Sequence, residues 1–385
     1  MITIGVDIEQ FVADPYGSGI QRVLQYLARE WPSDEIPADF VIPHGAEFLL
    51  ASPTQAARVL DAAFAAEDSH QVRHVVASHV EQLADECTRV TQSGLLSIYS
   101  SWLLPEVSYH PEVLQRLALF NQAMPCSMIG YDTLPMTEPA NYRFTPGTAA
   151  RVSEYFRLLA TVDSVVCISD YSRDSLLHRL RRNPAARTLV AHPGGDHIPV
   201  NQPHTSASPS GDVTFLRVGT MEARKQPIEI LRAFQDARVK GAQARLHFIG
   251  GASASDPATN SQIRRAVAND PAIIWTEGAS DGDVTTALQE ADYFLSFGIE
   301  GYGIPVLEAI RLGTPVLYGG IQPAADLMHG RGSTRMPDTS HDFLVSMFEE
   351  YSAPPAAGAL DDLLQPEAVP RWQDFTATVA RASVG

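Results

Sequence analysis

The sequence is poor in cysteine and in positive charge. Among its 385 residues are 3 cysteines, and 28 Lys and Arg side chains stand against 45 Asp and Glu side chains, for a formal net charge of −17. This deficit of cations argues against a nucleic-acid partner, because binding a phosphate backbone requires clustered positive charge. Cys87, Cys126 and Cys167 are too far apart along the chain to suggest zinc or a disulfide framework. We expect them to be reduced, buried packing residues.

Further absences concern membranes and cofactors. No apolar run approaches the roughly 18 residues that a membrane-spanning helix needs, and Met1 leads directly into a strand-like segment. The sequence therefore predicts a soluble cytoplasmic protein without stable membrane insertion. No complete G-x-G-x-x-G fingerprint occurs, which weakens an NAD-dehydrogenase interpretation, and the 12 histidines show no spacing such as H-E-x-x-H. We therefore expect no metal and no required cofactor.

What the sequence does contain is a regular alternation of short apolar strands and amphipathic helices. An apolar fraction of 45% with 19% charged residues is typical of a globular chain, and the length suffices for two domains. The alternation predicts an α/β fold with parallel sheets. In the first half, the expected strands are residues 2–6, 95–99, 127–130 and 164–168, and the expected helices are residues 19–30, 112–120 and 170–182.

A break in this alternation predicts a domain boundary. Residues 199–212 are dense in Pro and Ser and lack hydrophobic periodicity, which is typical of a linker. We therefore expect one Rossmann-like domain over residues 1–198 and another over residues 213–370. Two doubly wound domains joined in this way bind a ligand in the interdomain cleft, at the carboxyl ends of their strands.

The most informative segment runs from Glu300 to Glu308, two carboxylates around a glycine-rich turn between a strand-like and a helix-like run. The start of such a helix offers unpaired N–H groups, and Gly301 and Gly303 let the backbone approach a bulky anion. A diphosphate group is therefore the expected ligand. The carboxylates would then accept hydrogen bonds from hydroxyls on either side of the phosphates, which a nucleotide sugar has. The plainer alternative is a pair of solvated acids at a helix start.

Residues 300–308 also resemble the E-x7-E signature of the retaining glycosyltransferases of family 4, the group 1 glycosyltransferases. Residues 215–226 resemble the segment that opens the donor domain of that family, with Val-Gly-Thr followed by Arg-Lys. The resemblance implies the two-domain GT-B fold, with a C-terminal helix over residues 371–385 that crosses back to the first domain. The other similar segments are residues 16–23, 131–135, 166–172 and 246–251, so that the resemblance spans roughly residues 1–320.

The resemblance implies a function as well as a fold. A hexose-like sugar would move from a nucleotide diphosphate sugar (GDP-, UDP- or dTDP-linked) to an acceptor hydroxyl, with retention at the anomeric carbon. The acceptor would be a carbohydrate, a lipid-linked compound or a small molecule, as in polysaccharide biosynthesis or the glycosylation of a natural product. No carboxylate can be assigned from the sequence as a covalent nucleophile. The implied reaction is a front-face displacement in which the leaving diphosphate helps to take the acceptor proton.

The resemblance also assigns roles to residues. Arg224 and Lys225 would neutralise the departing diphosphate, Glu300 would hold hydroxyls of the donor sugar, and Glu308 would hold the ribose hydroxyls. Asp132 completes the expected catalytic set. The base is expected near residues 278–280. The other expected donor-binding residues are Gly17, Gly19, Gly219, Ser280, Gly301, Tyr302, Gly303 and Ile304.

Several of these residues have plainer interpretations. Arg224 and Lys225 could be surface charges at the start of a helix over residues 227–237, and Gly17 could belong to an ordinary turn before a helix. Asp132 could form an Asx-turn. Residues 281–283 match the D-x-D pattern of metal-dependent glycosyltransferases, but we interpret them as capping a helix over residues 284–290.

Two segments bear on specificity. Many family members carry histidine where this chain has Tyr131, and we expect the tyrosine, which can still hydrogen-bond a sugar hydroxyl, to affect the choice of sugar. The run of arginines over residues 173–187 is interpreted as a solvated helix face, without stable membrane binding. A non-hydrolysing sugar-nucleotide epimerase and a non-catalytic nucleotide-sugar-binding protein stay open as alternatives, and a phosphorylase fits less well because nothing resembles a pyridoxal-bearing lysine site.

Overall fold

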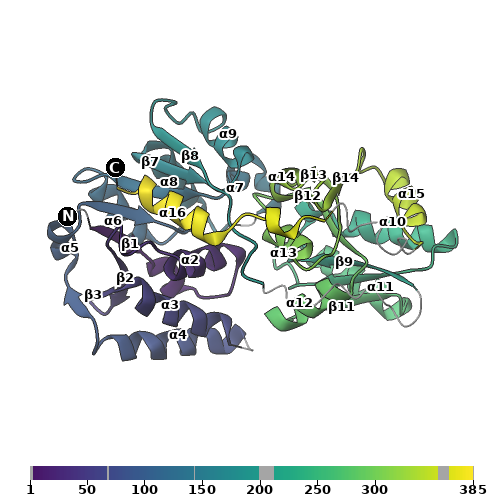
Figure 1. Cartoon of the computed structure of the whole chain (residues 1–385), viewed down its shortest axis with the longest axis horizontal. Coiled ribbons are helices and arrows are strands. Elements are labelled where there is room, and N and C mark those ends of the chain that lie inside the picture. The colour runs from purple at the N-terminus through teal and green to yellow at the C-terminus, as the bar shows by residue number, and fades with distance from the viewer. Residues whose placement is uncertain (1–2, 67–68, 143, 199–211, 354–363, 385) are drawn as a thin grey trace. The chain divides into compact units, whose positions relative to one another are not determined.

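A computed structural model of the chain describes residues 3–66, 69–142, 144–198, 212–353 and 364–384 (Figure 1). The predicted linker, residues 199–212, lies outside the described residues except for Asp212. The chain folds into two compact units. Unit 1 comprises Met1–Pro139, Phe144–Pro193 and Arg371–Gly385, and unit 2 comprises Ala140–Arg143 and Gly194–Pro370.

Unit 1 contains one sheet of eight strands. The strands are β1 (Ile4–Asp7), β2 (Ala38–His44), β3 (Glu47–Ala51), β4 (Thr88–Val90), β5 (Ser101–Leu104), β6 (Cys126–Gly130), β7 (Ser164–Cys167) and β8 (Arg187–Val190). Their order is β4-β3-β2-β1-β5-β6-β7-β8. All pairs from β2 to β8 are parallel, whereas β3 and β4 add an antiparallel edge that the sequence did not predict. The central strands are buried along their whole length, as in a sheet covered on both faces.

Helices connect these strands. They are α1 (Glu9–Ala13), α2 (Gly19–Arg29), α3 (Pro53–Phe64), α4 (Ser69–Leu83), α5 (Gln92–Ile98), α6 (Pro111–Phe120), α7 (Leu134–Thr137), α8 (Pro146–Thr161), α9 (Asp170–His178) and α16 (Trp372–Ala382), with a 3-10 turn, η1 (Pro139–Asn141), after α7. No helix among the described residues is long and apolar enough to cross a membrane.

One predicted strand is wrong. Residues 95–99 lie in and just after helix α5, and the strand is β5, which follows it. The Thr91 side chain accepts a hydrogen bond from the N–H of Gly94, and this N-cap starts a helix where apolarity alone suggested a strand. Short apolar runs fit either structure, so the error is one that periodicity cannot prevent.

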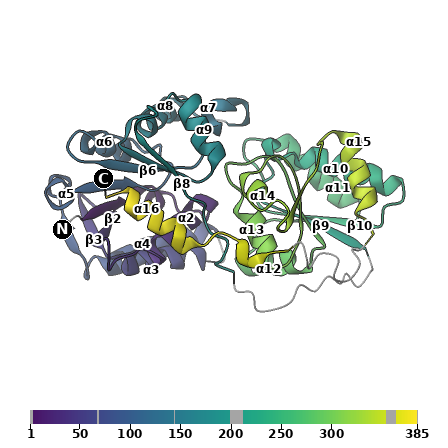
Figure 2. The same cartoon turned by 45° about the horizontal axis from the view of Figure 1, so that its top comes forward.

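The last helix, α16, packs within unit 1, where both views show it beside α2 (Figures 1 and 2). The Trp372 ring stacks on that of Tyr26 with 4.7 Å between centroids. The Ser127 hydroxyl donates to the Ser383 hydroxyl oxygen at 2.8 Å, linking β6 to the end of α16. Residues far apart in sequence therefore share one core.

The cysteines follow the prediction in part. Cys126 and Cys167 are buried in the central strands of unit 1, and burial raises the pKa of both thiols to about 12. Cys87 is half-buried. All three are free thiols.

Unit 2 contains one sheet of six parallel strands. These are β9 (Val213–Val218), β10 (Ala244–Ile249), β11 (Ile273–Thr276), β12 (Tyr293–Ile299), β13 (Val316–Ile321) and β14 (Ser333–Arg335). Their order is β11-β10-β9-β12-β13-β14. Because the order reverses between β9 and β12, the loops that follow these two strands diverge there, which is where doubly wound sheets bind ligands.

Helices cover the unit 2 sheet. They are η2 (Ala223–Lys225), α10 (Pro227–Val239), α11 (Pro257–Asn269), α12 (Asp281–Glu290), α13 (Ile304–Arg311), α14 (Pro323–Leu327), α15 (His341–Glu350) and η3 (Pro366–Ala368). The Phe348 ring on α15 packs edge-on against Phe215 of β9 and Phe234 of α10, with centroids 4.9 and 5.4 Å away. This aromatic cluster fixes β9 and α10, and with them the two ends of the loop that carries Arg224 and Lys225.

Candidate active site

The loop between β9 and α10 folds back on itself. Gly219 has φ +125°, and its N–H donates to the Ile249 carbonyl at 2.8 Å, which turns the chain as β9 ends. A methyl group at Gly219 would lie 3.0 Å from Lys225 Nζ. The glycine that we expected to contact the donor therefore makes room for the lysine.

A second glycine lets this loop rest on β12. Gly298 has φ +90°, and a methyl group there would lie 2.1 Å from the Arg224 carbonyl oxygen, so no side chain fits. The close approach brings Arg224 and Lys225 to the end of β12, where Glu300 follows. We did not predict a role for Gly298, although a glycine inside a buried apolar strand is itself a sign of close backbone approach.

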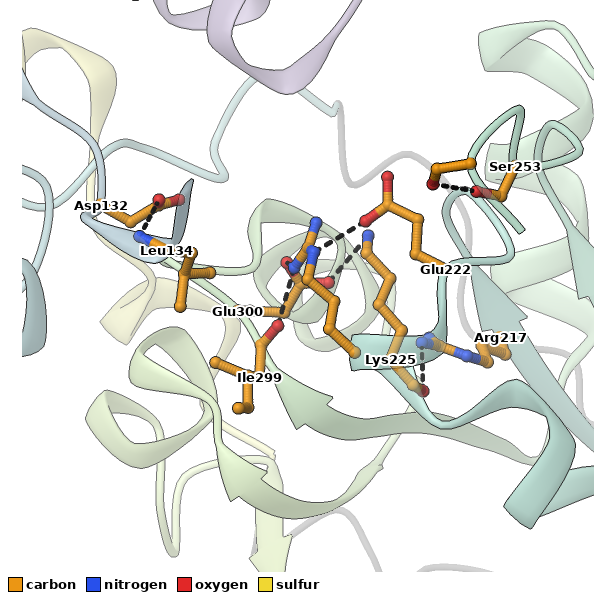
Figure 3. Close-up of polar contacts among 10 residues, drawn as sticks. Asp132, Leu134, Arg217, Glu222, Lys225, Ser253, Ile299 and Glu300 are labelled. Atoms are coloured by element: carbon orange, nitrogen blue, oxygen red, sulfur yellow. Dashed lines mark hydrogen bonds and ion pairs between the residues drawn. The ribbon is translucent and has the colours of Figure 1, made fainter. Parts of the chain in front are cut away.

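Glu300 binds both cations of the loop (Figure 3). Arg224 Nη1 lies 2.9 Å from Glu300 Oε2, and Lys225 Nζ lies 2.8 Å from Oε1. Arg224 Nη1 also donates to the Ile299 carbonyl at 2.7 Å, while Arg224 Nε forms an ion pair with Glu222 at 2.7 Å. The sequence placed the three expected residues in one site, but it gave no sign of Glu222 as a fourth member.

The cluster is largely shielded from solvent, with the side chains of Arg224, Lys225 and Glu300 between 13 and 19% exposed. Burial opposes ionisation of Glu300, but Lys225 and Arg224 outweigh it and lower the pKa of the carboxyl to about 2. Burial likewise disfavours the charged Arg224, yet Glu300 and Glu222 raise the pKa of its guanidinium. Glu300 and Arg224 are thus both charged at neutral pH. Glu300 contacts the two cations themselves, and the separate roles expected for them, phosphate binding and sugar binding, stay predictions.

Glu308 has a partner that the sequence did not indicate. It lies on the second turn of α13, buried, with its Oε1 2.8 Å from His197 Nε2. These residues are 111 positions apart, so no local pattern could have joined them. The interpretation of Glu308 as a solvated acid is wrong, because its side chain is 11% exposed.

The turn between Glu300 and α13 matches the prediction in its geometry. Gly303, with φ +107°, is the N-cap of α13, a conformation that favours glycine, and Ile304 is the first helical residue. The Tyr302 side chain is buried, and its carbonyl accepts a hydrogen bond from Ala324 at 3.0 Å, which ties the turn to α14. This contact holds the N-terminus of α13, which follows Gly301 in the sequence, beside the cluster.

The loop expected to contact the base is the start of α12. The Ser280 hydroxyl accepts from the Asp283 N–H at 3.2 Å, and Asp283 Oδ2 accepts from the Ser280 N–H at 2.9 Å. The capping interpretation of residues 281–283 is right, although α12 begins at Asp281, three residues before the predicted start, and Ser280 is the cap. The hydroxyl expected beside the base donates to Asp283 at 2.7 Å instead.

In unit 1, backbone N–H groups of the turn before α2 are hydrogen-bonded within the turn and the helix that follows it. Gly17 has φ +67°, and the N–H groups of Tyr16 and Gly17 both donate to Gln21 Oε1 at 2.9 Å. The Ser18 hydroxyl caps α2, which begins at Gly19. The Gly17 amide, which we expected to reach phosphates, is therefore used within the turn.

Asp132 and Tyr131 follow β6 and are held by the backbone around them. Asp132 Oδ1 accepts from the Leu134 N–H at 2.9 Å, which is the Asx-turn (Figure 3). Tyr131 is buried, and its hydroxyl donates to the Pro105 carbonyl at 2.7 Å. The proton of this hydroxyl is therefore used inside unit 1, which leaves only its oxygen to accept a hydrogen bond from a sugar hydroxyl.

The arginines after β7 do not form one basic face. Arg182 is 1% exposed, and its guanidinium donates to the Thr188 hydroxyl and to three carbonyls, those of Leu159, Asp163 and Arg187. Arg173 forms ion pairs with two acids of its own helix. The interpretation as a solvated helix face is therefore wrong for Arg182. The other members of the run are Arg179, Arg181 and Arg187.

Glu106, just after β5, carries an unusual carboxyl. It is 1% exposed, and burial raises its pKa to about 8, although hydrogen bonds to the Phe11 backbone and to Gln21 act in the opposite direction. The folded chain therefore keeps this proton up to about pH 8, whereas an unfolded carboxyl loses it near its ordinary value of 4.5. The folded state binds more protons over that range, so stability falls as the pH rises through it.

Replacing Glu106 by glutamine is expected to remove this loss of stability, because an amide does not ionise. The melting temperature of E106Q should exceed that of the wild type at about pH 9 and differ less at about pH 4, as differential scanning fluorimetry can measure. The exposed Glu35 supplies the control E35Q, for which we expect no such dependence. A difference that does not change with pH would contradict the assignment.

Comparison with solved structures defines the class of the fold. The chain resembles Anabaena HepE in complex with UDP, with a TM-score of 0.60, 12% identity and coverage of 99% of this chain and 98% of that one. It also resembles WaaG, a glycosyltransferase of lipopolysaccharide biosynthesis, with a TM-score of 0.54, 14% identity and coverage of 98% and 94%. The two parallel-rich α/β units therefore form a GT-B fold, as the sequence predicted.

The sequence comparisons find similarity to one family over part of the chain. Residues 201–329 match the family model described as glycosyl transferases group 1. The serotype-specific mannosyltransferase WbdA of Escherichia coli is 24% identical over 254 residues, which cover 61% of this chain and 30% of that protein. The chain thus spans less than a third of the length of the curated relatives that it matches. These findings confirm the resemblance to the group 1 glycosyltransferases.

Proposed function

We propose that the chain is a metal-independent, retaining glycosyltransferase that moves a hexose-like sugar from a nucleotide diphosphate sugar to an acceptor hydroxyl. The observation that carries the proposal is the cluster in which Glu300 holds Arg224 and Lys225 at 2.9 and 2.8 Å. It lies where the strand order of unit 2 reverses, at the carboxyl ends of β9 and β12. Two shielded cations at that position suit a diphosphate.

In the proposed reaction, the donor exchanges partners with Glu300. The diphosphate takes over Arg224 and Lys225, and the released carboxylate accepts hydrogen bonds from the donor sugar. As the bond from the anomeric carbon to the diphosphate oxygen breaks, negative charge grows on the leaving group, and the two cations stabilise it. The acceptor hydroxyl attacks the same face, and its proton passes to the leaving phosphate oxygen. The N-terminus of α13 adds partial positive charge nearby.

The comparisons suggest which donors to try first. A mannose donor is tested first because the E. coli relative is a mannosyltransferase. Glucose comes second because HepE, which shares the fold, has been solved with UDP-glucose. A carbohydrate acceptor, free or lipid-linked, is proposed because WaaG, which shares the fold, takes part in lipopolysaccharide biosynthesis.

A donor panel followed by product analysis tests the proposal. GDP-mannose, UDP-glucose and dTDP-glucose are added separately, and the donor that binds the folded chain raises its melting temperature by mass action. If the sugar of the donor is α-linked, NMR of the product formed with mannoside or glucoside acceptors should show an α-linkage. The activity should persist in excess EDTA. Conversion of the donor to a different nucleotide sugar in the absence of acceptor would indicate an epimerase. Donor binding without sugar transfer would indicate a non-catalytic protein. Loss in EDTA with rescue by Mn²⁺ would contradict metal independence.

Glu308 supplies a prediction about binding. If it accepts hydrogen bonds from the ribose hydroxyls, E308Q should weaken donor affinity by about 1–3 kcal/mol, the range for losing charge-assisted bonds. Titration calorimetry measures the change, with a 2′-deoxyribose donor as control, because that donor already lacks one of the two hydroxyls. An unchanged dissociation constant in E308Q would remove Glu308 from the site.

A further inference from the structure

Arg217 is a third cation of this cluster. Arg217 is the penultimate residue of β9 and is 3% exposed. Its Nη2 donates a hydrogen bond to the backbone carbonyl of Lys225 at 2.7 Å. Figure 3 shows Arg217 beside Lys225, with a dashed line marking this hydrogen bond. Nothing in the sequence motif indicated a role for it, because its neighbours on β9 are apolar.

The hydrogen bonding of Arg217 is incomplete for so buried a group. Its Nε is buried and has no hydrogen-bond partner among the described residues. Arg182 provides a comparison within the chain, because its equally buried guanidinium donates to a hydroxyl and to three carbonyls. Most buried donors in proteins are satisfied, as those of Arg182 are, although the Nε atoms of Arg151 and Arg311 are also buried without a partner among the described residues. The donors of Arg217 are not all satisfied.

Arg217 also leaves the cluster with unbalanced charge. Burial lowers the pKa of the guanidinium to about 10, with Glu300 acting against this change and Arg224 adding to it, so that Arg217 is protonated at neutral pH. Three cations, Arg217, Arg224 and Lys225, then face two carboxylates, Glu222 and Glu300. A shielded surplus of one positive charge is unfavourable until an anion arrives.

We propose that Arg217 is a positioning residue for Lys225, which it holds by the backbone carbonyl, and that it supplies the positive charge that a nucleoside diphosphate neutralises on binding. The inference rests on the proposed function, since it concerns the same donor site. It predicts that Arg217 contributes to binding the second phosphate more than to binding the nucleoside or the first phosphate. Because Arg217 is buried, it acts through the loop and its field and not by direct contact.

Four variants separate charge, hydrogen bonding and general destabilisation. R217M removes both the charge and the donor, R217Q keeps a donor without charge, and R217K keeps the charge. R238M is the matched control, because Arg238 of α10 also donates to a backbone carbonyl, that of Ala244 at 2.8 Å, at the far end of that helix. The probes are UDP and UMP, with GDP and GMP in parallel, titrated by calorimetry into the full chain.

We expect R217M and R217Q to weaken diphosphate binding about tenfold and monophosphate binding less than about threefold, and R217K to restore most of the loss. R238M should bind as the wild type does. Equal affinities in wild type and R217M, equal losses in R217M and R238M, or no rescue by R217K would overturn the proposal. So would neutral variants that fail to fold even with UDP or GDP, because Arg217 would then be structural. Wild-type protein that binds none of the probes would instead contradict the proposed function.

Discussion

Replacing Lys225 by alanine is expected to lower kcat about 100-fold while changing the donor KM by less than about threefold. The ammonium group lies 2.8 Å from Glu300 in the ligand-free chain and is available to the diphosphate once the donor displaces that carboxylate. Because the charge on the leaving group grows in the transition state, removing the cation costs more there than in the ground state. Steady-state kinetics with the donor chosen by the panel measures the two constants.

The chain offers a matched control for this variant. Lys240 is the only other lysine of the sequence, and its side chain is 58% exposed and paired with Glu349 at 3.2 Å. K240A should keep wild-type kinetics, since an exposed ion pair contributes little. A rise in KM without a fall in kcat in K225A would mean that Lys225 binds ground state and transition state equally, and the proposed role in the chemical step would be wrong.

Replacing Glu300 by alanine is expected to destabilise the ligand-free chain by about 3 kcal/mol. The change leaves Arg224 and Lys225 shielded beside each other without the carboxylate that both contact. Urea denaturation measures the loss, and E277Q is the control, because Glu277 forms an exposed ion pair with Arg264 on the same unit.

The same ion pairs make wild-type stability depend on pH. The pKa of Glu300 is lowered to about 2 in the folded chain from an ordinary 4.5, so its contribution is complete above pH 4.5 and is lost as the pH falls from there towards 2. E300A should lack this part of the acid dependence. Phosphate or a nucleoside diphosphate should restore more stability to E300A than to the wild type, because the freed cations then have an anion to bind. Equal stabilisation of both proteins would contradict the cluster.

The features that the sequence predicted well are local. Gly303 ends the turn and α13 begins at Ile304 because the backbone there needs a positive φ and then a helix, both of which short patterns encode. The C-terminal helix expected over residues 371–385 is also present, as α16 from Trp372 to Ala382. The capping of α12 was also predictable, because Ser280 and Asp283 are three residues apart.

The features that could not be predicted from the sequence depend on contacts between distant residues. Arg224 and Glu300 are 76 positions apart, so their pairing arises only when β9 and β12 become neighbours. The pair of His197 and Glu308 has the same origin. A pattern of charges gives no measure of burial either, which is why Arg182 was interpreted as part of a solvated face. Its real surroundings are set by carbonyls from other segments.

The central claim is that the donor binds at the loop after β9 and the turn after β12. Hydrogen–deuterium exchange of the full chain, with and without the nucleotide sugar that the panel selects, tests it most directly. The account predicts slower exchange over residues 219–226 and 300–308 when the donor is bound, since the diphosphate orders both segments. Protection confined to other parts of the chain, with these two segments unchanged at saturating donor, would contradict it.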